Sequence, residues 1–293
     1  MMKDNQNARG TLILSMVIFG TIGIFRKYIP LSSGIVAFVR GILGVVFLLA
    51  FVKIKRIPID KKMIRKYLKV LLISGALIGL NWVLLFESYR YTSVAVATLC
   101  YYMAPIFVML ASPILLQEKL TVKKLLCAAV ALLGMVFVSG VLDGGISGTS
   151  ELRGILFGLG AAVLYATVIL MNQKLGEVGT YDKTMIQLGA AALVLIPYLL
   201  LTEDFSNITL TPLIGIMLLI VGVVHTGIAY ALYFGSMNHL KAQTVALFSY
   251  IDPIVAIILS ALFLKEPMTL SGGIGAVLVL GATLTSELSE KND

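Results

Sequence analysis

The chain has 293 residues, of which 59% are hydrophobic and 13% are charged, and its formal net charge is +8. An ordinary soluble domain carries roughly 25% charged residues, so this composition excludes that class and indicates an integral membrane protein. The basic residues cluster in short segments between apolar runs, which argues against nucleic-acid binding. The two cysteines, Cys100 and Cys127, lie within apolar runs and predict neither a disulfide framework nor a metal site.

Ten apolar segments follow one another along the chain. Each is close to the roughly 20 residues that a helix needs to cross about 30 Å of hydrocarbon. In order they are 11–29, 34–52, 69–89, 94–116, 122–141, 154–174, 183–201, 212–235, 242–264 and 270–287. They are too long and too uniformly apolar for the strands of a membrane barrel. We therefore predict an all-α integral membrane protein with ten transmembrane helices.

The second half of the chain repeats the first at an offset of 148 residues. The clearest copies are 100–118 and 248–266, each an apolar run with a proline and a terminal glutamate. The shift aligns identical residues at Phe86/Phe234, Ser88/Ser236, Leu99/Leu247, Tyr102/Tyr250, Pro105/Pro253, Ile106/Ile254, Ser112/Ser260, Leu116/Leu264, Glu118/Glu266 and Thr121/Thr269. Apolar composition alone would not align these residue types in one frame. We therefore predict two repeats, 1–145 and 146–293.

Lys and Arg residues indicate the orientation of the spans, because cytoplasmic loops carry an excess of them. An even number of spans places both termini on one side, and most basic residues fall on that side, so both termini are predicted to be cytoplasmic. The basic stretch 53–69 belongs to this side and is expected to lie against anionic lipid head groups. Each repeat has five spans, an odd number, so the second enters the membrane inverted, as in many secondary transporters.

This layout resembles the EamA family of the drug/metabolite transporter superfamily. The residues that carry the resemblance are Pro105 with Glu118-Lys119-Leu120-Thr121, and Pro253 with Glu266-Pro267-Met268-Thr269. The resemblance covers essentially the whole chain and implies a secondary carrier of small metabolites, often amino acids or amines, working without ATP. We expect no enzymatic activity, no cofactor and no metal, and a location in the plasma membrane of a prokaryote.

Three charged residues in or near the spans are candidate site residues. Asp252 adjoins Pro253 near the middle of the ninth span, where a charge costs roughly 2.5–3.5 kcal/mol unless it faces a polar cavity or a partner. It is a candidate site for a cation or a proton. Arg40, in the second span, could bind a substrate carboxylate bidentately, or pair with Asp252 or Glu87 as a structural contact. Glu87 lies beside Arg90 near the outer end of the third span.

Polar and aromatic residues at midplane depth form a second candidate set. A tyrosine hydroxyl in the membrane needs a partner, which favours a wet cavity, and aromatic rings can hold an amine through cation–π contacts. A histidine titrates near neutral pH, so His225 is a candidate proton carrier, with a packing role as the alternative. The whole set comprises Asn81, Trp82, Tyr101, Tyr102, Tyr165, His225, Tyr230 and Tyr250.

Two prolines occupy matching places in the fourth and ninth spans, at Pro105 and Pro253. A proline inside a helix removes one backbone hydrogen bond. The two are therefore expected to free the carbonyls of Tyr101 and Ser249 and to act as hinges. A static kink that suits helix packing is the alternative.

These residues support more than one function. The leading interpretation is a transporter of amino acids or related zwitterions, with Arg40 and Asp252 binding opposite charges and a proton exchanged at Asp252 or His225. The second keeps the fold but takes organic cations or amines, bound by Asp252 and the tyrosines. An intramembrane enzyme or sensor is the remote alternative. The expected partners are a small-molecule substrate, the lipid bilayer and coupling protons, while the oligomeric state and the direction of transport stay open.

Overall fold

The computed structural model describes residues 2–92, 94–139, 149–205, 210–259, 262–263 and 270–290. Every regular element within these ranges is helical, and seven helices are long and apolar enough to cross a membrane. Two shorter apolar stretches occur at Ala242–Ala256 and Leu270–Thr285. The prediction of an all-α membrane fold is therefore confirmed for the described residues. Parts of the predicted repeat lie outside them, namely Ser260, Leu264, Glu266-Pro267-Met268-Thr269 and the junction between the repeats at 145/146.

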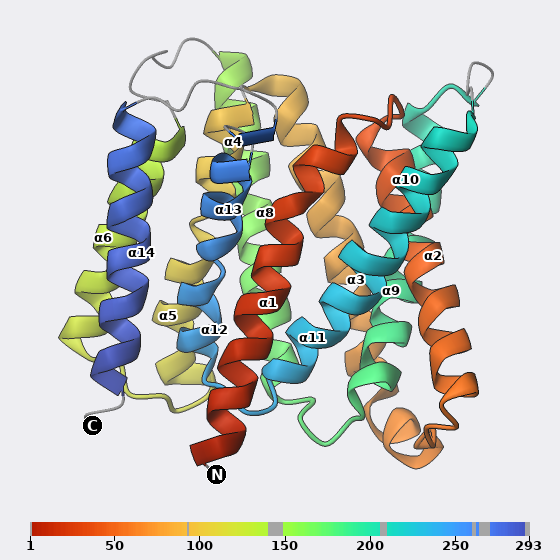
Figure 1. The fold of residues 1–293 in the computed structure, drawn as a ribbon, viewed down its shortest axis with the longest axis horizontal. Helices are drawn as coiled ribbons and strands as arrows, with labels where there is room; N and C mark the ends of the chain where they lie inside the picture. Colours follow the sequence, from red (N-terminus) through yellow and green to blue (C-terminus); the bar gives the residue numbers. More distant parts are fainter. Residues whose placement is uncertain are drawn as a thin grey trace. The chain divides into compact units, whose positions relative to one another are not determined.

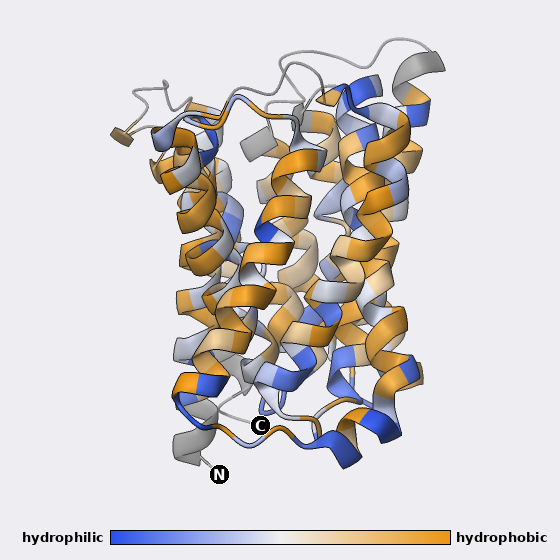
Figure 2. Cartoon of the chain, turned by 90° about the vertical axis from the view of Figure 1, so that its right-hand side faces the viewer, coloured by the Kyte–Doolittle hydropathy of each residue, from blue (hydrophilic) through white to orange (hydrophobic). Residues whose placement is uncertain are grey.

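Hydrophobic residues occupy most of the length of the helices, and hydrophilic residues gather toward the helix ends (Figure 2). Large apolar side chains such as Leu126, Leu193 and Val277 are exposed, as expected of side chains that face lipid. Hydrocarbon offers the backbone no hydrogen-bond partner, so a spanning segment must satisfy its N–H and C=O groups internally. A helix does this within a single segment, which is why these apolar runs fold as helices.

The chain divides into two compact units, and each unit combines segments of both predicted repeats (Figure 1). Unit 1 holds Met1–Val83 and Met171–Leu240, and unit 2 holds Leu84–Leu170 and Lys241–Asp293. The chain therefore passes from one unit to the other within a helix on two occasions, once in α3 and once in α8.

Unit 1 is built around α2 and α9, which pack along each other. On α3, Gly75 and Gly79 allow a close approach to α9, since a Cβ at Gly75 would lie 2.5 Å from the carbonyl oxygen of Gln187. Small residues at such contacts are typical of helices that associate in membranes. The elements of this unit are α1 (Met2–Arg26), α2 (Ser33–Ile54), most of α3 (Lys61–Tyr91), the end of α8 (Thr149–Gln173), α9 (Thr180–Thr202), α10 (Pro212–Gly222), the π-helical turn η2 (Val223–Ile228) and α11 (Ala229–Ser236).

Unit 2 is built around α6 and α14, which have the most extensive contact of any helix pair in the unit. Gly134 of α6 lies against α14, where an added Cβ would be 2.7 Å from the carbonyl oxygen of Gly275. Buried side chains of Met109, Met135 and Tyr250 fill the core beside this pair. The elements are the end of α3, α4 (Val94–Tyr101), α5 (Ala104–Leu115), α6 (Val122–Ser139), most of α8, α12 (Ala242–Phe248), α13 (Ile251–Leu259) and α14 (Leu270–Glu290).

The helix boundaries repeat at the same offset as the sequence. Shifted by 148 residues, each helix from α1 to α6 begins within three residues of an element in the second half. We call elements or residues related by this shift counterparts. The counterparts α2 and α9 pack together in unit 1, and the counterparts α6 and α14 pack together in unit 2. The counterpart of α3 differs most, because it consists of α10 and α11 with the π-helical turn η2 between them.

The close contact of α3 with α9 can be tested with two glycine substitutions. We expect Gly75→Ala to destabilise the protein by about 1–3 kcal/mol, because the added methyl group would lie 2.7 Å from the Cβ of Ala190. Gly189→Ala is the control, since no atom lies within 4 Å of its added Cβ, and it should leave stability unchanged or raise it. Thermal unfolding in detergent measures both, and equal melting temperatures for the two variants would contradict the contact.

Candidate functional site

Two helices of unit 2 are interrupted at matching places. The helix α4 ends at Tyr101 and α5 begins at Ala104, while α12 ends at Phe248 and α13 begins at Ile251. At each interruption a backbone N–H donates a hydrogen bond to the carbonyl three residues earlier, which is a tighter turn than that of an α-helix. The Met103 N–H donates to the carbonyl of Cys100 at 3.1 Å, and the Tyr250 N–H donates to that of Leu247 at 3.2 Å. Half-helices that meet inside the membrane are a frequent feature of transporter binding sites.

Both prolines stand in the first turn of the second half-helix. Pro105 is the second residue of α5, and Pro253 is the third residue of α13. A first-turn proline lacks an N–H that would have no helical partner there, so it suits a helix that restarts. Free carbonyls at Tyr101 and Ser249 stay a prediction. Beside them, the carbonyl of Tyr102 accepts the Tyr250 hydroxyl at 3.0 Å. A hinge role for the prolines stays a prediction.

Tyrosines from several helices meet around these interruptions. The rings of Tyr102 and Tyr250 lie 6.1 Å apart between centroids. These two residues are counterparts, so the same position of the two predicted repeats meets here. Tyr101 stacks on Tyr165 of α8, with centroids 5.4 Å apart and planes 21° apart. Four of the predicted tyrosines are thus brought together in unit 2.

Asp252 joins this tyrosine cluster at the first turn of α13. It is partly buried, and its carboxylate is close enough to Tyr89 and Tyr102 to interact with them electrostatically. A negative charge is favourable at the N-terminal end of a helix, where the backbone N–H groups point outward. Tyr89, near the end of α3, was missed in the sequence because a tyrosine there is typical of a membrane interface.

Glu87 and Arg90 form an ion pair near the end of α3, with 2.9 Å between a carboxylate oxygen and Nη1. The Arg90 side chain is 61% exposed, and the Glu87 side chain is 16% exposed. Solvent exposure on one side of the pair is typical of an interfacial ion pair. A role for Glu87 in substrate binding stays a prediction.

A second candidate cluster lies in unit 1, around Trp82 of α3. The guanidinium carbon of Arg40 lies 4.5 Å from the centre of a Trp82 ring, a cation–π contact. Within the described residues, the buried Nε of Arg40 has no hydrogen-bond partner. Trp82 also meets Tyr230 of α11, with centroids 6.3 Å apart, and these two residues are again counterparts. The neighbouring Asn81 is buried, being 3% exposed.

His225 lies in the π-helical turn η2 of unit 1. Its Nε2 is 2.8 Å from the hydroxyl oxygen of Thr21, and its ring packs edge-on against Phe25 at 4.9 Å. The side chain is almost fully buried, at 1% exposure. A π-helical turn adds one residue to a helix and is frequent at functional sites. The structure therefore connects His225 to α1, a contact that the sequence does not indicate.

The predicted site residues thus divide between the two units. Unit 1 contains Arg40, Asn81, Trp82, His225 and Tyr230. The remaining members belong to unit 2, namely Glu87, Tyr101, Tyr102, Tyr165, Tyr250, Asp252, Pro105 and Pro253. Because Arg40 and Asp252 belong to different units, their joint binding of one zwitterion stays a prediction.

One buried cation was not anticipated. Lys183, on the first turn of α9, is fully buried. Its Nζ donates hydrogen bonds to the carbonyl of Phe234 at 3.1 Å and to Oδ1 of Asn238 at 2.8 Å. Both acceptors lie at the C-terminal end of α11, where helix carbonyls lack partners and a positive charge is favourable. Lys183 therefore fixes the end of α11 to α9, the helix that precedes α10 in the chain.

Glu118, the glutamate of the repeated motif, binds the beginning of α12. Its carboxylate accepts the backbone N–H of Ala242 at 2.7 Å and that of Gln243 at 3.3 Å. The Gln243 side chain in turn donates to the hydroxyl of Ser112 on α5 at 2.8 Å. These bonds satisfy two of the N–H groups that a helix start leaves open. Since α12 leads directly into the interruption at Ser249, Glu118 positions the half-helix that carries Tyr250.

Comparison with known proteins identifies the family. The family model of the EamA-like transporter family matches residues 10–140 and, a second time, residues 152–286. The chain belongs to the EamA-like transporter family. This membership confirms the resemblance seen in the sequence, and it makes the chain a multi-pass membrane protein of the drug/metabolite transporter superfamily.

Several relatives of this EamA-like protein are named as uncharacterized transporters. Uncharacterized transporter YxxF of Bacillus subtilis is 31% identical over 286 residues, which cover 97% of this chain and 90% of the relative. An uncharacterized transporter of Archaeoglobus fulgidus is 26% identical, with 93% of each chain covered. Protein PecM of Dickeya dadantii is 27% identical over 73% of this chain and 72% of its own. A crystal structure with 18% identity superposes over 98% of both chains with a TM-score of 0.86, so the EamA-like protein shares its fold.

The role of Glu118 can be tested in this EamA-like protein by removing its carboxylate. We expect Glu118→Ala to destabilise the fold by about 0.5–2 kcal/mol, the usual cost of losing a side chain that caps a helix start. Glu118→Gln keeps one acceptor oxygen and should lose less. The control is Glu177→Gln, because the Glu177 side chain is 59% exposed. Thermal unfolding in detergent compares the three, and a Glu118→Ala variant as stable as the control would exclude the capping role.

Proposed function

We propose that this protein is a secondary active transporter that moves small metabolites across the plasma membrane by alternating access. Its family is one of transporters. In this proposal the chain has ten spans in two inverted five-helix repeats, and both termini lie in the cytoplasm. The substrate is moved without being chemically converted. Repeats of opposite orientation can exchange conformations, which opens a central site first to one side and then to the other.

The observation that carries the proposal is the contact of residues with their own counterparts. Tyr102 meets Tyr250 in unit 2, and Trp82 meets Tyr230 in unit 1. An axis that relates inverted repeats lies in the plane of the membrane, so residues beside it stay at the midplane when the repeats exchange conformations. A substrate bound there can be reached in turn from either face. One charged residue adjoins each pair, Asp252 in unit 2 and Arg40 in unit 1.

The substrate class that best matches these groups is the amino acids and related zwitterions. The tyrosines and Asp252 suit an ammonium group, through cation–π contacts and charge. Arg40 suits a carboxylate, because a guanidinium offers several N–H donors in a plane and the Nε of Arg40 has no partner within the described residues. Asp252 and His225 are the candidates for exchanging a proton with the substrate.

Organic cations or amines are the second candidate substrates. The observation in their favour is that Arg40 already lies on the ring of Trp82, while Asp252 and the tyrosines cluster together in unit 2. An amine would then need only the groups of unit 2. A substrate that lacks a carboxylate separates the two possibilities, because Arg40 would contribute nothing to its binding.

Counterflow in proteoliposomes tests the transporter assignment. Purified full-length protein is reconstituted, and labelled amino acids and amines are screened with and without an imposed pH gradient. We expect at least one compound of these classes to accumulate, and a proton gradient to drive its uptake against its own gradient. If no compound moved faster than in protein-free vesicles under any gradient, the proposed function would be wrong.

Replacing Asp252 tests its part in transport. We expect Asp252→Asn to lower substrate affinity roughly tenfold or more, because a hydrogen bond to a charged group is worth about 1.5–3 kcal/mol. The variant should also lose acceleration by a pH gradient if Asp252 carries the proton. Flux measurements between pH 5 and 8 check both, with Glu177→Gln as the exposed control. Near-normal flux and pH dependence in Asp252→Asn would remove Asp252 from the mechanism.

Replacing Arg40 distinguishes the two substrate classes. Lysine keeps the charge but cannot form two parallel hydrogen bonds to a carboxylate. For a zwitterionic substrate we expect Arg40→Lys to weaken binding by roughly tenfold to a hundredfold. The matched control is Arg153→Lys, because Arg153 is exposed on α8. If Arg40→Lys bound an amino acid with unchanged affinity, and the amine with the same side chain competed for the same site, the organic-cation alternative would be favoured.

A further inference from the structure

We propose that the beginning of α3, together with the end of α2, binds the head groups of anionic phospholipids. The helix α3 has 31 residues, so at about 1.5 Å per residue it is some 46 Å long. The hydrocarbon layer is only about 30 Å thick, so several turns of α3 must extend beyond it. The basic residues in these first turns carry the proposal.

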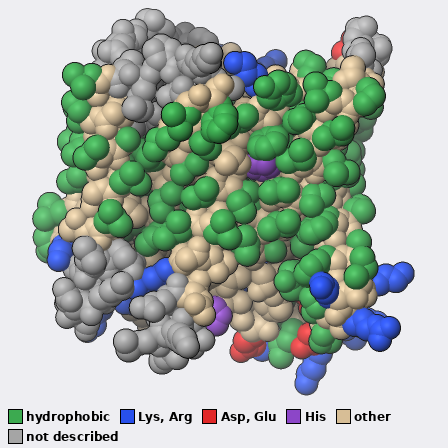
Figure 3. Space-filling view, in the orientation of Figure 1, with side chains coloured by type: hydrophobic (Ala, Val, Ile, Leu, Met, Phe, Trp, Pro, Cys, Tyr) green, Lys and Arg blue, Asp and Glu red, His purple; other side chains and the backbone are tan. Residues whose placement is uncertain are grey.

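These basic residues share one face of the helix. Along α3 they lie one, four, five and eight residues after the first of them, and these offsets place the side chains on adjacent rows of a helix surface. All of them are exposed, and they comprise Lys61, Lys62, Arg65, Lys66 and Lys69. We call this set the basic face of α3. In Figure 3, Lys and Arg side chains gather below the apolar surface, over the ends of α2 and α3.

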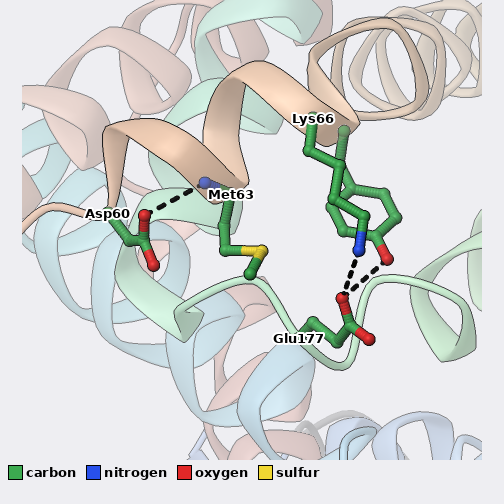
Figure 4. Close-up of polar contacts among 5 residues, drawn as sticks. Asp60, Met63, Lys66 and Glu177 are labelled. Carbon is green, nitrogen blue, oxygen red and sulfur yellow. Dashed lines mark hydrogen bonds and ion pairs between the residues drawn. The ribbon is translucent and has the colours of Figure 1, made fainter.

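The basic face does not stabilise the helix that carries it. Asp60 caps the start of α3, where its Oδ1 accepts the N–H groups of Lys62 and Met63 at 3.0 Å. Figure 4 shows the contact with Met63. The N-terminal end of a helix is already positive, so lysines in the first turn are unfavourable there. An anion held from outside the chain would offset this repulsion. Asp60 already accepts N–H groups at the start of α3, so such an anion would bind the basic side chains.

One member of the basic face has an internal partner. Lys66 donates to a carboxylate oxygen of Glu177 at 2.8 Å, and the hydroxyl of Tyr67 donates to the same oxygen (Figure 4). These bonds, that from Lys66 above all, lower the pKa of the Glu177 carboxyl. The other four members of the basic face have no ion pair within the described part of the chain. Four positive charges of the face are therefore not neutralised there.

The neighbouring elements increase the positive charge. Exposed basic residues at the end of α2 and after α8 add to the face, namely Lys53, Lys55, Arg56 and Lys174. The acidic groups nearby are Asp60, which caps α3, Glu177, which pairs with Lys66, and the buried Asp182, which accepts the N–H of Asp60 at 3.1 Å. The positive charges outnumber the negative ones, and each carboxylate is already engaged.

Exposed apolar residues favour a lipid as the partner. Ile54 is 77% exposed, Ile59 is 44% exposed and Leu68 is 39% exposed, all among the basic residues. Aliphatic side chains beside Lys and Arg are typical of segments that lie in the interface between head groups and acyl chains. A nucleic acid offers no apolar layer for such side chains. The membrane that holds α3 supplies anionic head groups next to its first turns.

The test measures stabilisation of the full-length protein by lipid in mixed micelles. Phosphatidylglycerol is titrated against phosphatidylcholine of the same chain length, and the shift in melting temperature reports binding. We expect phosphatidylglycerol to raise the melting temperature at low salt and the effect to shrink in 1 M NaCl, where screening acts within about 3 Å. Each basic residue near a membrane surface contributes about fivefold in affinity. Arg65→Gln/Lys69→Gln should therefore bind roughly 25-fold more weakly.

A second pair of exposed lysines supplies the control. Lys119→Gln/Lys123→Gln removes the same charge from residues outside the face, and it should keep the response of the wild type to phosphatidylglycerol. An equal loss in both double variants would overturn the assignment to α3, as would a wild type that does not distinguish the two lipids. A short single-stranded DNA serves as a soluble polyanion. If it stabilised the protein as well as phosphatidylglycerol did at equal charge, the surface would bind polyanions in general and the proposal would fail.

Discussion

The structure depends on one constraint: in hydrocarbon, every backbone N–H and C=O group must find its hydrogen-bond partner inside the protein. This constraint turns each long apolar run into a helix, and it makes each interruption of a helix informative. At Tyr102–Met103 and at Ser249–Tyr250 the backbone leaves the α-helical pattern and tightens instead. The carbonyl of Tyr102 is satisfied by a side chain, the hydroxyl of Tyr250. The interruption is therefore stabilised by a side chain from another segment of the chain and not by the helix itself.

The sequence repeat explains why the aromatic residues of the candidate site occur as counterpart pairs. Positions at which the two repeats differ are those where specificity can arise. Tyr102 and Tyr250 are identical counterparts in contact, whereas Trp82 and Tyr230 are counterparts that differ in chemistry. The charged site candidates Arg40 and Asp252 have no charged counterpart. The counterpart of Asp252 is Ala104, a fully buried apolar residue. The two repeats thus share helix positions but carry side chains of different chemistry at them.

Buried and partly buried polar side chains fix the helix ends around the two clusters. Lys183 binds the end of α11, and Glu118 binds the start of α12. In unit 1, Gln187 donates to Ser74 at 2.6 Å and to Asn172 at 3.3 Å, and so links α9 to α3 and α8. In a medium without water, such bonds are worth making because the alternative is an unsatisfied polar group. They are also directional, so they hold the helices in one register where apolar packing alone would allow sliding.

The features that the sequence by itself determined are those that depend on the order of residue types along the chain. Membrane-spanning helices follow from long apolar runs, the duplicated unit from residues that match at an offset of 148, and family membership from that layout with its Pro and Glu motif. Asp252, Arg40 and the midplane tyrosines stand out because a polar group is costly in hydrocarbon. Each of these inferences needs only the neighbours of a residue in sequence and the nature of the solvent.

The tertiary structure alone decided which residues meet. Nothing around Lys183 indicates that its partners are Phe234 and Asn238, and nothing around Glu118 indicates that it binds Ala242, because these contacts join segments far apart in the chain. The sequence also does not predict how the site residues divide between two units that each combine both repeats. Such contacts depend on how helices pack, and small residues such as Gly75 set that packing through steric fit. An apolar pattern specifies that a helix is buried in the membrane, but not which neighbour it lies against.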